Sequence, residues 1–556
     1  MNLVIKQNNQ SKETVPDSSI VEKLYNLTKE DVANGITAIA TVPSGGLQGW
    51  IEVPAAYQDA VDYLNEHFGP NLKIDALSYY IRFYDPEVVR VLIAKGVIQE
   101  GEGLTIAQTE LLPTGNGGAN QSWWNGNTQI RRFDELKYFG RCRGGSHEMG
   151  QWFVNATNLE SVDLTGFTNL RGFRLFEGCI NLRYFHGYGN EPANTLNLVN
   201  LTSFNASFAG CDKLHHVTSL GVVSQFRDST FRNCSNLEDV NLPVQCAQIK
   251  SNTFDGCTNL TTINLDNLTN IDISAFKNCV NLEYFSGPNS TSGVLNLPML
   301  SSLGNEAFRG CAKLTTIISL GTITSIGNSA FEGCSLLATI PFPNTLTTIG
   351  TNALANTTWY NNQPNGAVII NNKILYKYKG NVGGSYSVPS TIISITSDCF
   401  KNDSSLTGVT IPSSVTILGE EVFQNTGLTS IVLPGSITSI GKDLCYGCSN
   451  LTSVTISEGI TEIPQGMFIN CPLTEIELPT TVNKIGSHLV GVLTNTTAPL
   501  QKLILRNPNQ VVTIKEASLN GVSSTCQIQV PSSLVNSYKV AQYWSNFASQ
   551  IQAIPT

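Results

Sequence analysis

Two pairs of residues have the types and spacing of metal chemistry. Cys445-x-x-Cys448 could supply half of a zinc site, which needs two further ligands. His147-Glu148 begins like the zinc-binding helix of a metalloprotease, but the second histidine of that motif does not follow. Both cysteines also stand at positions that recur along the chain, where core packing explains them. We therefore expect no metal and no catalytic residues at these positions.

A third pair, His215-His216, lies between two apolar residues. At least one imidazole must then project outward, and we interpret the pair as exposed polar residues. No phosphate-binding loop, Gly-x-Ser-x-Gly nucleophile motif or paired-carboxylate motif stands out in the sequence. The sequence therefore predicts that the protein is not an enzyme and needs no cofactor.

The overall composition limits the partners that the protein can have. The net charge is −9 and the pI is about 5.3, which argues against nucleic acid, because nucleic-acid binding depends on clustered Lys and Arg. No run of about 18 apolar residues is present, so we expect no membrane insertion. Residues 1–10 also lack the apolar segment of a secretory signal peptide, so we expect no export by that route.

A short motif recurs from about residue 130 almost to the C-terminus. In the segment 254–265, an anchoring phenylalanine (Phe254) is followed by Cys257 and then by Leu-x-x-Ile-x-Leu. A second pattern, Ile-x-x-Ile, ends five residues before the next anchor. The anchors, most of them 22 or 23 residues apart, are Phe153, Phe176, Phe208, Phe231, Phe254, Phe276, Phe308, Phe331, Leu354, Phe400, Phe423, Cys445, Phe468, Val490 and Leu519. A fixed period of this length predicts a repeat solenoid.

The cysteines follow the repeat. Cys211, Cys234, Cys257 and Cys279 are 23, 23 and 22 residues apart. We interpret them as small buried thiols stacked along the solenoid. Disulfides between coils stay an alternative, because stacking brings neighbouring Cα atoms within about 5 Å. The cysteines at 179, 211 and 234 return at 279, 311 and 334, which indicates that a block of 100 residues was duplicated.

The full pattern, Phe-x-x-Cys-x-x-Leu-x-x-Ile-x-Ile-Pro-x-x-Ile-x-x-Ile-Gly, resembles the BspA-like leucine-rich repeat family over about residues 130–550. Residues 133–139 look like that family's opening segment, residues 359–378 like its hairpin insertion and residues 530–545 like its closing helix. The resemblance implies a surface protein that binds extracellular proteins or other cells. Members normally carry an export signal, and this chain departs from them there.

The expected fold class is mainly β: a leucine-rich-repeat solenoid of about 15 coils, with a small α/β N-terminal domain and a C-terminal capping helix. The expected segments are a flexible arm (1–20), a small α/β attachment domain (21–112), a Gly/Asn-rich linker (113–129), the solenoid (130–529, with a hairpin insertion at 357–386) and a C-terminal cap (530–556). Helices are predicted at 55–68 and from the N-cap Asp85 to Gly96. Trp123 and Trp124 are expected to cover the first coil.

Aromatic residues gather where the repeat period is interrupted, and interruptions of solenoids often carry function. Tyr and Trp suit binding interfaces, because they are large and partly polar. The candidate ligand contacts are Tyr184, His186, Tyr188, Tyr284, Trp359, Tyr360, Tyr376 and Tyr378. The alternative is that these side chains pack over their own loops.

These features favour a non-catalytic recognition or adhesion protein that contacts protein or glycan on a cell surface. Residues 1–125 are expected to attach the repeat rod to a larger assembly. The preferred setting is a bacteriophage virion, as a fibre or decoration protein, because such a protein assembles in the cytosol, where cysteines stay reduced. The alternatives are a bacterial cell-surface adhesin whose leader was removed and an intracellular protein-binding scaffold.

Overall fold

The computed structural model describes most of the chain from residue 123 onward and parts of the segment before it. The described residues are 2–7, 10–15, 36–41, 80–81, 83–100, 104–105, 108, 123–141, 151–165, 167–172, 174–190, 192–490, 500–520 and 522–555. They fall into two compact units: Met1–Cys246 with Thr253–Ile263, and Ala247–Asn252 with Asn264–Thr556. The predicted helix at 55–68 and the His147-Glu148 pair lie outside the described residues. Within the described ranges, no helix has the length and hydropathy to cross a membrane.

The first residues of the first unit form strands, where the sequence predicted a flexible arm. Strand β1 (Asn2–Gln7) pairs antiparallel with β2 (Gln10–Val15) and with β3 (Ile36–Thr41), in the order β2-β1-β3. The apolar run from Leu3 to Ile5 supplies a strand propensity that the polar composition of the whole segment conceals.

Helix α4 (Pro86–Ala94) begins and ends where the sequence predicts. The Asp85 carboxylate caps it by accepting a hydrogen bond from the Glu87 N–H (2.9 Å). Gly96 follows its end with a φ of +71°, the left-handed conformation that glycine adopts at low cost. The buried side chains of the helix are Val88, Val91 and Leu92. Their spacing of three and four residues gives the helix one apolar face.

The coils of the first unit contribute short strands that pair in parallel from one coil to the next. The further elements of this unit are β4 (Tyr80–Ile81), β5 (Leu104–Thr105), β6 (Arg132–Phe133), the 3₁₀ helix η4 (Asp134–Arg141), β7 (Ser161–Val162), β8 (Asn169–Gly172), β9 (Thr195–Asn197), β10 (Ser203–Ala206), β11 (His216–Ser219), β12 (Asp239–Val240) and β14 (Thr262–Ile263). Four of them form a sheet in the order β14-β12-β11-β9. Only β4 and β5 pair antiparallel among these.

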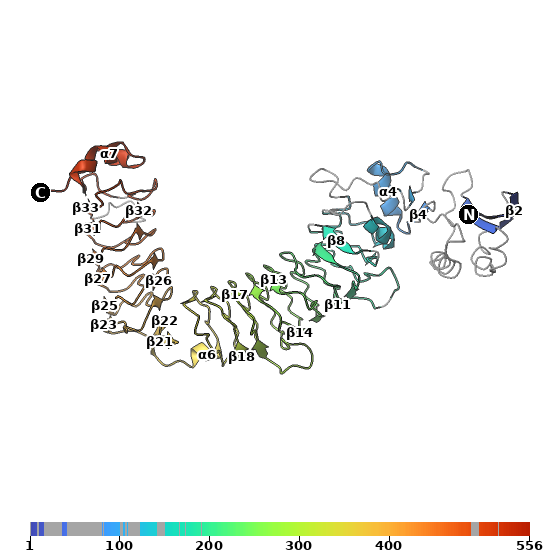
Figure 1. Cartoon of the computed structure of the whole chain (residues 1–556), viewed down its shortest axis with the longest axis horizontal. Helices are drawn as coiled ribbons and strands as arrows, with labels where there is room; N and C mark the ends of the chain where they lie inside the picture. Colours follow the sequence, from blue (N-terminus) through green and yellow to red (C-terminus); the bar gives the residue numbers. More distant parts are fainter. Residues whose placement is uncertain are drawn as a thin grey trace. The chain divides into compact units, whose positions relative to one another are not determined.

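The second unit carries two parallel ladders of the same kind. Its elements are β13 (Gln248–Ile249), β15 (Asn270–Ile271), β16 (Val294–Asn296), β17 (Ser302–Leu303), β18 (Thr316–Ser319), β19 (Ser325–Ile326), β20 (Thr348–Ile349), α6 (Thr358–Asn361), β21 (Gly366–Ile370), β22 (Ile374–Lys379), β23 (Gly384–Ser387), β24 (Ser394–Ile395), β25 (Leu406–Thr410), β26 (Ile417–Leu418), β27 (Ser430–Leu433), β28 (Ser439–Ile440), β29 (Ser453–Ile456), β30 (Glu462–Ile463), β31 (Glu475–Leu478), β32 (Lys484–Ile485), β33 (Lys502–Leu505), β34 (Gln527–Val530), η5 (Ser532–Leu534), α7 (Val535–Val540), η6 (Trp544–Phe547) and β35 (Ile551–Ala553). The strands β23, β25, β27, β29, β31 and β33 follow one another along one side of the stacked coils (Figure 1). The predicted solenoid is confirmed.

The anchor side chains stack inside the coils. The rings of Phe153 and Phe176 lie 5.3 Å apart with an interplanar angle of 6°, and those of Phe308 and Phe331 lie 5.7 Å apart at 1°. All four side chains are fully buried. At these coils the anchor position holds a flat, apolar ring that stacks on the ring of the next coil, whereas Leu354, Cys445, Val490 and Leu519 fill the same position with other buried side chains.

Two tryptophans extend the stack at the first coil. Trp124 is fully buried and stacks on Phe153 at 5.5 Å, and Trp123 stacks on Trp152 at 4.9 Å. The Trp124 N–H donates to the Trp152 carbonyl (2.9 Å), so the backbone pairs as well. The prediction that the tryptophans cover the first coil is confirmed. The solenoid starts with them, within the segment predicted as a linker.

The cysteine position has a hydrogen-bonding role besides packing. The Cys257 thiol donates to the carbonyl of Phe231 in the preceding coil (3.0 Å), and the Cys334 thiol donates to that of Phe308 (3.1 Å). Burial raises the pKa of the Cys334 thiol to about 12. All thirteen cysteines in the described part of the chain are buried, and none of them forms a disulfide. The position therefore selects a small apolar residue with a weak donor.

Left-handed backbone recurs in the coils two residues before and two residues after the anchor. Asn252 and Gly256, on either side of Phe254, have φ values of +56° and +77°. Asn and Gly tolerate this conformation best. The asparagine before the repeated leucine, Asn259, also lies in a turn, and its side-chain amide donates to Asn236 of the preceding coil (3.2 Å).

The predicted insertion contains a hairpin that is built into the solenoid. Strands β21 and β22 pair antiparallel, but β22 also pairs in parallel with β24 of the following coil. These strands belong to the sheet with the order β21-β22-β24-β26-β28. The hairpin therefore continues a ladder of the second unit.

The C-terminal cap combines short helices with a last strand. Helix α7 spans six residues, and β35 follows it and pairs in parallel with β34. Tyr538 and Trp544 are buried beneath this segment. Both bind the backbone of Val512: its N–H donates to the Tyr538 hydroxyl oxygen (2.9 Å), and its carbonyl accepts from Trp544 Nε1 (2.7 Å). These bonds fasten the cap to the last coils.

Candidate functional site

A group of half-buried and exposed tyrosines and arginines lies at the first coils. We define this Tyr–Arg patch as Tyr84, Arg132, Arg183, Tyr184 and Tyr188. The guanidinium carbon of Arg132 is 4.1 Å from the centre of the Tyr188 ring and 5.2 Å from that of Tyr84. The Tyr184 and Tyr188 rings lie 5.1 Å apart, and the Arg183 guanidinium lies 5.2 Å from Tyr184. Tyr188 is 49% exposed and Tyr84 is 46% exposed.

The buried carboxylate of Asp85 brings Tyr84 to the patch. Its Oδ1 caps helix α4, and its Oδ2 accepts hydrogen bonds from the N–H groups of Arg131 (2.7 Å) and Arg132 (3.0 Å). The Tyr84 N–H donates to Glu135 Oε1 (3.0 Å). One carboxylate therefore joins the segment before the helix to strand β6.

Both arginines of the patch are held by carboxylates. Arg132 Nη2 lies 2.7 Å from Asp134 Oδ2, and Arg183 Nη2 lies 2.6 Å from Glu160 Oε2. The Ser161 hydroxyl donates to Asp134 in turn. The charges of the patch are thus largely compensated within the protein, while Tyr84 and Tyr188 stay exposed to solvent.

His186 lies in the same insertion but bonds to its own loop. Its Nε2 is 2.8 Å from the Asn197 carbonyl oxygen, and its backbone forms an antiparallel bridge with Asp163. Tyr184 forms a parallel bridge with Ser161. The structure therefore brings three of the sequence-predicted contacts, Tyr184, His186 and Tyr188, into one region, and the two tyrosines face one another.

The predicted contacts of the hairpin segment pack largely over their own loops. Trp359 lies edge-on to Phe342 at 5.2 Å. Tyr376 is only 5% exposed, and its hydroxyl accepts from the Leu354 N–H (3.0 Å). Burial raises the pKa of that hydroxyl. Because its ring is enclosed by the core, Tyr376 does not belong to a binding surface.

The other two hairpin tyrosines are half-buried. Tyr378 packs on Phe400 at 5.7 Å, and Tyr360 lies 5.9 Å from Tyr376. Lys379 covers the Tyr360 ring at 5.1 Å and donates to the Tyr360 carbonyl (3.1 Å). The remaining candidate, Tyr284, is half-buried and follows Glu283 where Tyr184 follows Arg183. These residues lie in the second unit.

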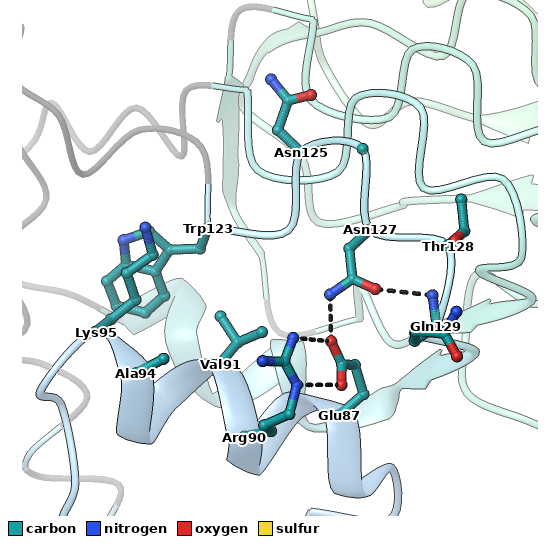
Figure 2. A pocket seen from close by; sticks show the side chains of 11 residues that line it. Glu87, Arg90, Val91, Ala94, Lys95, Trp123, Asn125, Asn127, Thr128 and Gln129 are labelled. Carbon is teal, nitrogen blue, oxygen red and sulfur yellow. Dashed lines mark hydrogen bonds and ion pairs between the residues drawn. The ribbon is translucent and has the colours of Figure 1, made fainter.

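A pocket lies between α4 and residues 123–129 (Figure 2). Glu87, on its wall, accepts hydrogen bonds from Arg90 (2.6 Å) and Asn127 (2.5 Å). The pKa of Glu87 is lowered, mainly because its carboxylate accepts a hydrogen bond from the Arg90 side chain. The Glu87, Arg90 and Asn127 side chains bond to one another, and the Glu87–Asn127 bond joins helix α4 to the first coil.

Glu135 gives the first unit an expected pH dependence. It is 3% exposed, and burial raises the pKa of its carboxyl to about 7, against an ordinary value of 4.5. As the pH rises, the carboxyl loses its proton in the unfolded chain before it does so in the folded protein. The neutral carboxyl therefore contributes its full stability to the folded protein below pH 4.5. This contribution is lost as the pH rises through 7. We expect Glu135→Gln, which does not titrate, to be more stable than the wild type at pH 8 by roughly 2–3 kcal/mol.

The measurement is urea unfolding of wild type and Glu135→Gln between pH 5 and pH 8, followed by the fluorescence of the N-terminal tryptophans. The difference between the two proteins isolates Glu135 from other titrating groups. Stability curves that run parallel across this pH range would show that the carboxyl ionises normally in the folded protein.

The repeats of this chain are similar to those of a known protein family. The sequence profile of the BspA type leucine rich repeat region matches six copies, over residues 194–297, 293–382 and 368–491. No curated protein sequence matches the chain. The similar solved structures include a leucine-rich repeat protein from Bacteroides ovatus, a leucine rich cell surface protein from Faecalibacterium prausnitzii and the pneumococcal vaccine antigen PcpA.

The Bacteroides ovatus structure is 20% identical, with 65% of this chain and 92% of that chain covered and a TM-score of 0.25. The Faecalibacterium prausnitzii structure is 20% identical, with 67% and 86% covered and a TM-score of 0.29. The pneumococcal structure is 15% identical, with 60% and 79% covered and a TM-score of 0.27. The profile, in contrast, covers more than half of the sequence and matches the repeats described above. The chain therefore belongs to the BspA type leucine rich repeat family.

Proposed function

We propose that this protein is a non-catalytic recognition protein that binds a protein partner through the Tyr–Arg patch. The observation that carries the proposal is the exposure of Tyr84 and Tyr188, whose rings both lie near the Arg132 guanidinium. Tyr and Arg are the residues that most often supply the binding energy of protein interfaces. Rings already ordered by an arginine lose little side-chain entropy when a partner covers them.

The charges around the patch favour a protein surface over a strongly charged ligand. Arg132 and Arg183 already pair with carboxylates, so a highly anionic partner would have to displace Asp134 and Glu160. A partner with apolar and neutral polar groups can instead cover the tyrosine faces without breaking these pairs. A protein is therefore better supported as the partner of the Tyr–Arg patch than a charged polymer.

Substitution of the exposed ring tests this assignment. We expect Tyr188→Ala to weaken capture of the partner from a cell-surface extract at least tenfold, because central aromatic residues of an interface contribute about 2 kcal/mol or more. Capture is measured with immobilised wild-type and variant full-length protein, followed by mass spectrometry and a binding titration of the protein that is enriched.

Tyr284→Ala is the control from the duplicated block, since Tyr284 has the position equivalent to Tyr184, the ring that contacts Tyr188, and is preceded by Glu283 in place of an arginine. It should leave capture unchanged. Equal losses in Tyr188→Ala and Tyr284→Ala would place binding along the repeated face instead. Retention of binding in Tyr188→Ala would reject the patch, and loss of capture after deglycosylation of the extract would identify a glycan as the ligand.

The setting in which the protein is displayed is a finer proposal. We propose a bacteriophage virion, with residues 1–125 attaching the protein to the particle. The thirteen buried cysteines of the described residues form no disulfide, which supports assembly in a reducing compartment. Mass spectrometry of purified particles from the source should detect this chain. Its absence there, with detection in a cell-surface fraction or in the cytosol, would support the adhesin or the scaffold alternative.

A further inference from the structure

A second group of polar side chains lies on the sheet β14-β12-β11-β9 of the first unit. His215 and His216 stand where β11 begins, and Glu238 and Asp239 stand where β12 begins. One ligand atom each from His215, His216 and Glu238 lies within 4.8 Å of the others. The four side chains are between 32% and 49% exposed, so an ion in solution can reach them.

Parallel pairing of the two strands sets this geometry. His216 is the register partner of Asp239, and the Glu238 N–H donates to the His215 carbonyl (2.7 Å). The N–H groups of both histidines donate to the Asn194 carbonyl, at 2.8 and 3.1 Å. The backbone that carries the ligand atoms is therefore fixed by the ladder on both sides.

The chemistry of the donor set indicates a particular class of ion. Two imidazoles and one carboxylate suit zinc and its transition-metal neighbours, whereas calcium and magnesium require oxygen ligands. A tetrahedral site places ligand atoms roughly 3.4 Å apart. Small side-chain rotations would reach that spacing from the observed 4.8 Å limit.

Asp239 supplies the orienting contact that metal-binding histidines usually have. Its Oδ2 lies 2.5 Å from His216 Nδ1, which leaves Nε2 of the same ring as the nitrogen for a metal. His215 Nδ1 lies 3.3 Å from Glu238 Oε1, so these two side chains already converge. The two carboxylates also give the cluster negative charge before a cation binds.

The duplicated block shows that the solenoid does not require these residues. The equivalent coil of the second unit carries Thr315, Thr316, Ala338 and Thr339 at the same positions. Its backbone makes the same bonds: the Ala338 N–H donates to the Thr315 carbonyl (2.9 Å), and Thr316 bridges Thr339 in parallel. Threonine and alanine therefore suffice for the fold, and the ligand set is particular to the first block.

From this placement we propose that His215, His216 and Glu238 form a binding site for a divalent transition metal of the zinc class, with Asp239 as a positioning residue. Three protein ligands leave at least one coordination position open for water or for a side chain of a partner. The site is separate from the Tyr–Arg patch and does not depend on the function proposed for it.

The test uses full-length protein without a histidine tag, stripped with a chelator and titrated with Zn²⁺ by calorimetry and with Co²⁺ by visible absorption. The wild type should bind one equivalent and show the ligand-field bands of a four- or five-coordinate Co²⁺. The variant His215→Thr/His216→Thr/Glu238→Ala, built from the residues of the equivalent coil, should lose at least a hundredfold in affinity. Asp239→Asn should weaken binding about tenfold, as loss of an orienting partner does.

His186→Asn is the control, because His186 lies outside the cluster and bonds to its own loop; it should bind as the wild type does. Unchanged hydrogen exchange in the first unit of the triple variant confirms that its fold is retained. Absence of Zn²⁺ binding at 100 µM to the wild type, or equal binding by the triple variant, would overturn the proposal. In the second case the metal is held elsewhere, for instance by thiols.

Discussion

Replacing Trp544 with alanine is expected to destabilise the C-terminal coils of the second unit by about 3–5 kcal/mol. Trp544 is 1% exposed, and its ring lies 5.1 Å from the buried ring of Tyr538. Its Nε1 donates to the Val512 carbonyl, so truncation removes a large apolar group and leaves a buried acceptor without this donor. In a solenoid each coil is stabilised mainly by its neighbours, so we expect the loss to appear first in β33 and β34.

Hydrogen exchange of peptides that cover β33 and β34 measures this effect, with β25 and β27 as internal reference. Val540→Ala is the matched control: Val540 is an apolar residue of α7 that is 80% exposed, and its loss should cost less than about 0.5 kcal/mol. Trp544→Phe keeps most of the apolar volume and should recover more than half of the stability. Equal protection of β33 and β34 in wild type and Trp544→Ala would show that the cap does not stabilise the coils.

The coils could be predicted from the sequence because the same packing arrangement recurs in coil after coil. Each anchor meets the anchors of the neighbouring coils, as Phe308 meets Phe331, so the residue type and the spacing repeat together. The left-handed positions carry an equally regular signal. Gly256 and its equivalents stand two residues after the anchor because the backbone there has positive φ, a pattern that the apolar periodicity alone does not reveal.

The Tyr–Arg patch could be predicted only in part. Tyr184 and Tyr188 interrupt the period, which marked them as candidates, but Tyr84 and Arg132 carry no such signal. They meet because Asp85 binds backbone groups 46 and 47 residues further along the chain. A pairing of that kind depends on tertiary structure, and neither composition nor spacing encodes it.

The metal-ligating cluster, in contrast, was encoded in the period. A coil of 23 residues places His215 beside Glu238 and His216 beside Asp239, as the strand register shows. A search for partners three or four residues away, as in a helix, finds only the exposed histidine pair itself. In a parallel solenoid the neighbours of a side chain are one repeat length away, so motifs must be sought at that distance.

Asp85→Ala is expected to release helix α4 from the first coil, at a cost of about 3–5 kcal/mol. The carboxylate accepts three backbone hydrogen bonds: one from Glu87, which caps the helix, and two from Arg131 and Arg132. Alanine would leave these donors without their acceptor in a site where Asp85 itself is 9% exposed. Since Tyr84 reaches the Tyr–Arg patch through this contact, the substitution should also weaken partner binding in proportion to the population of the released state.

Asp85→Ser separates the two roles of the carboxylate. A serine can cap the helix but is too short to reach strand β6, so it should recover about 1 kcal/mol of the loss, the usual contribution of an N-cap. Hydrogen exchange over residues 83–100 and 123–141 measures both variants, and Glu100→Ala, at an exposed position after the helix, is the control. Full recovery by serine would mean that capping alone holds α4 in place. Recovery limited to the helix itself, with residues 123–141 still exchanging faster, would show that the bonds to Arg131 and Arg132 join the N-terminal segment to the solenoid.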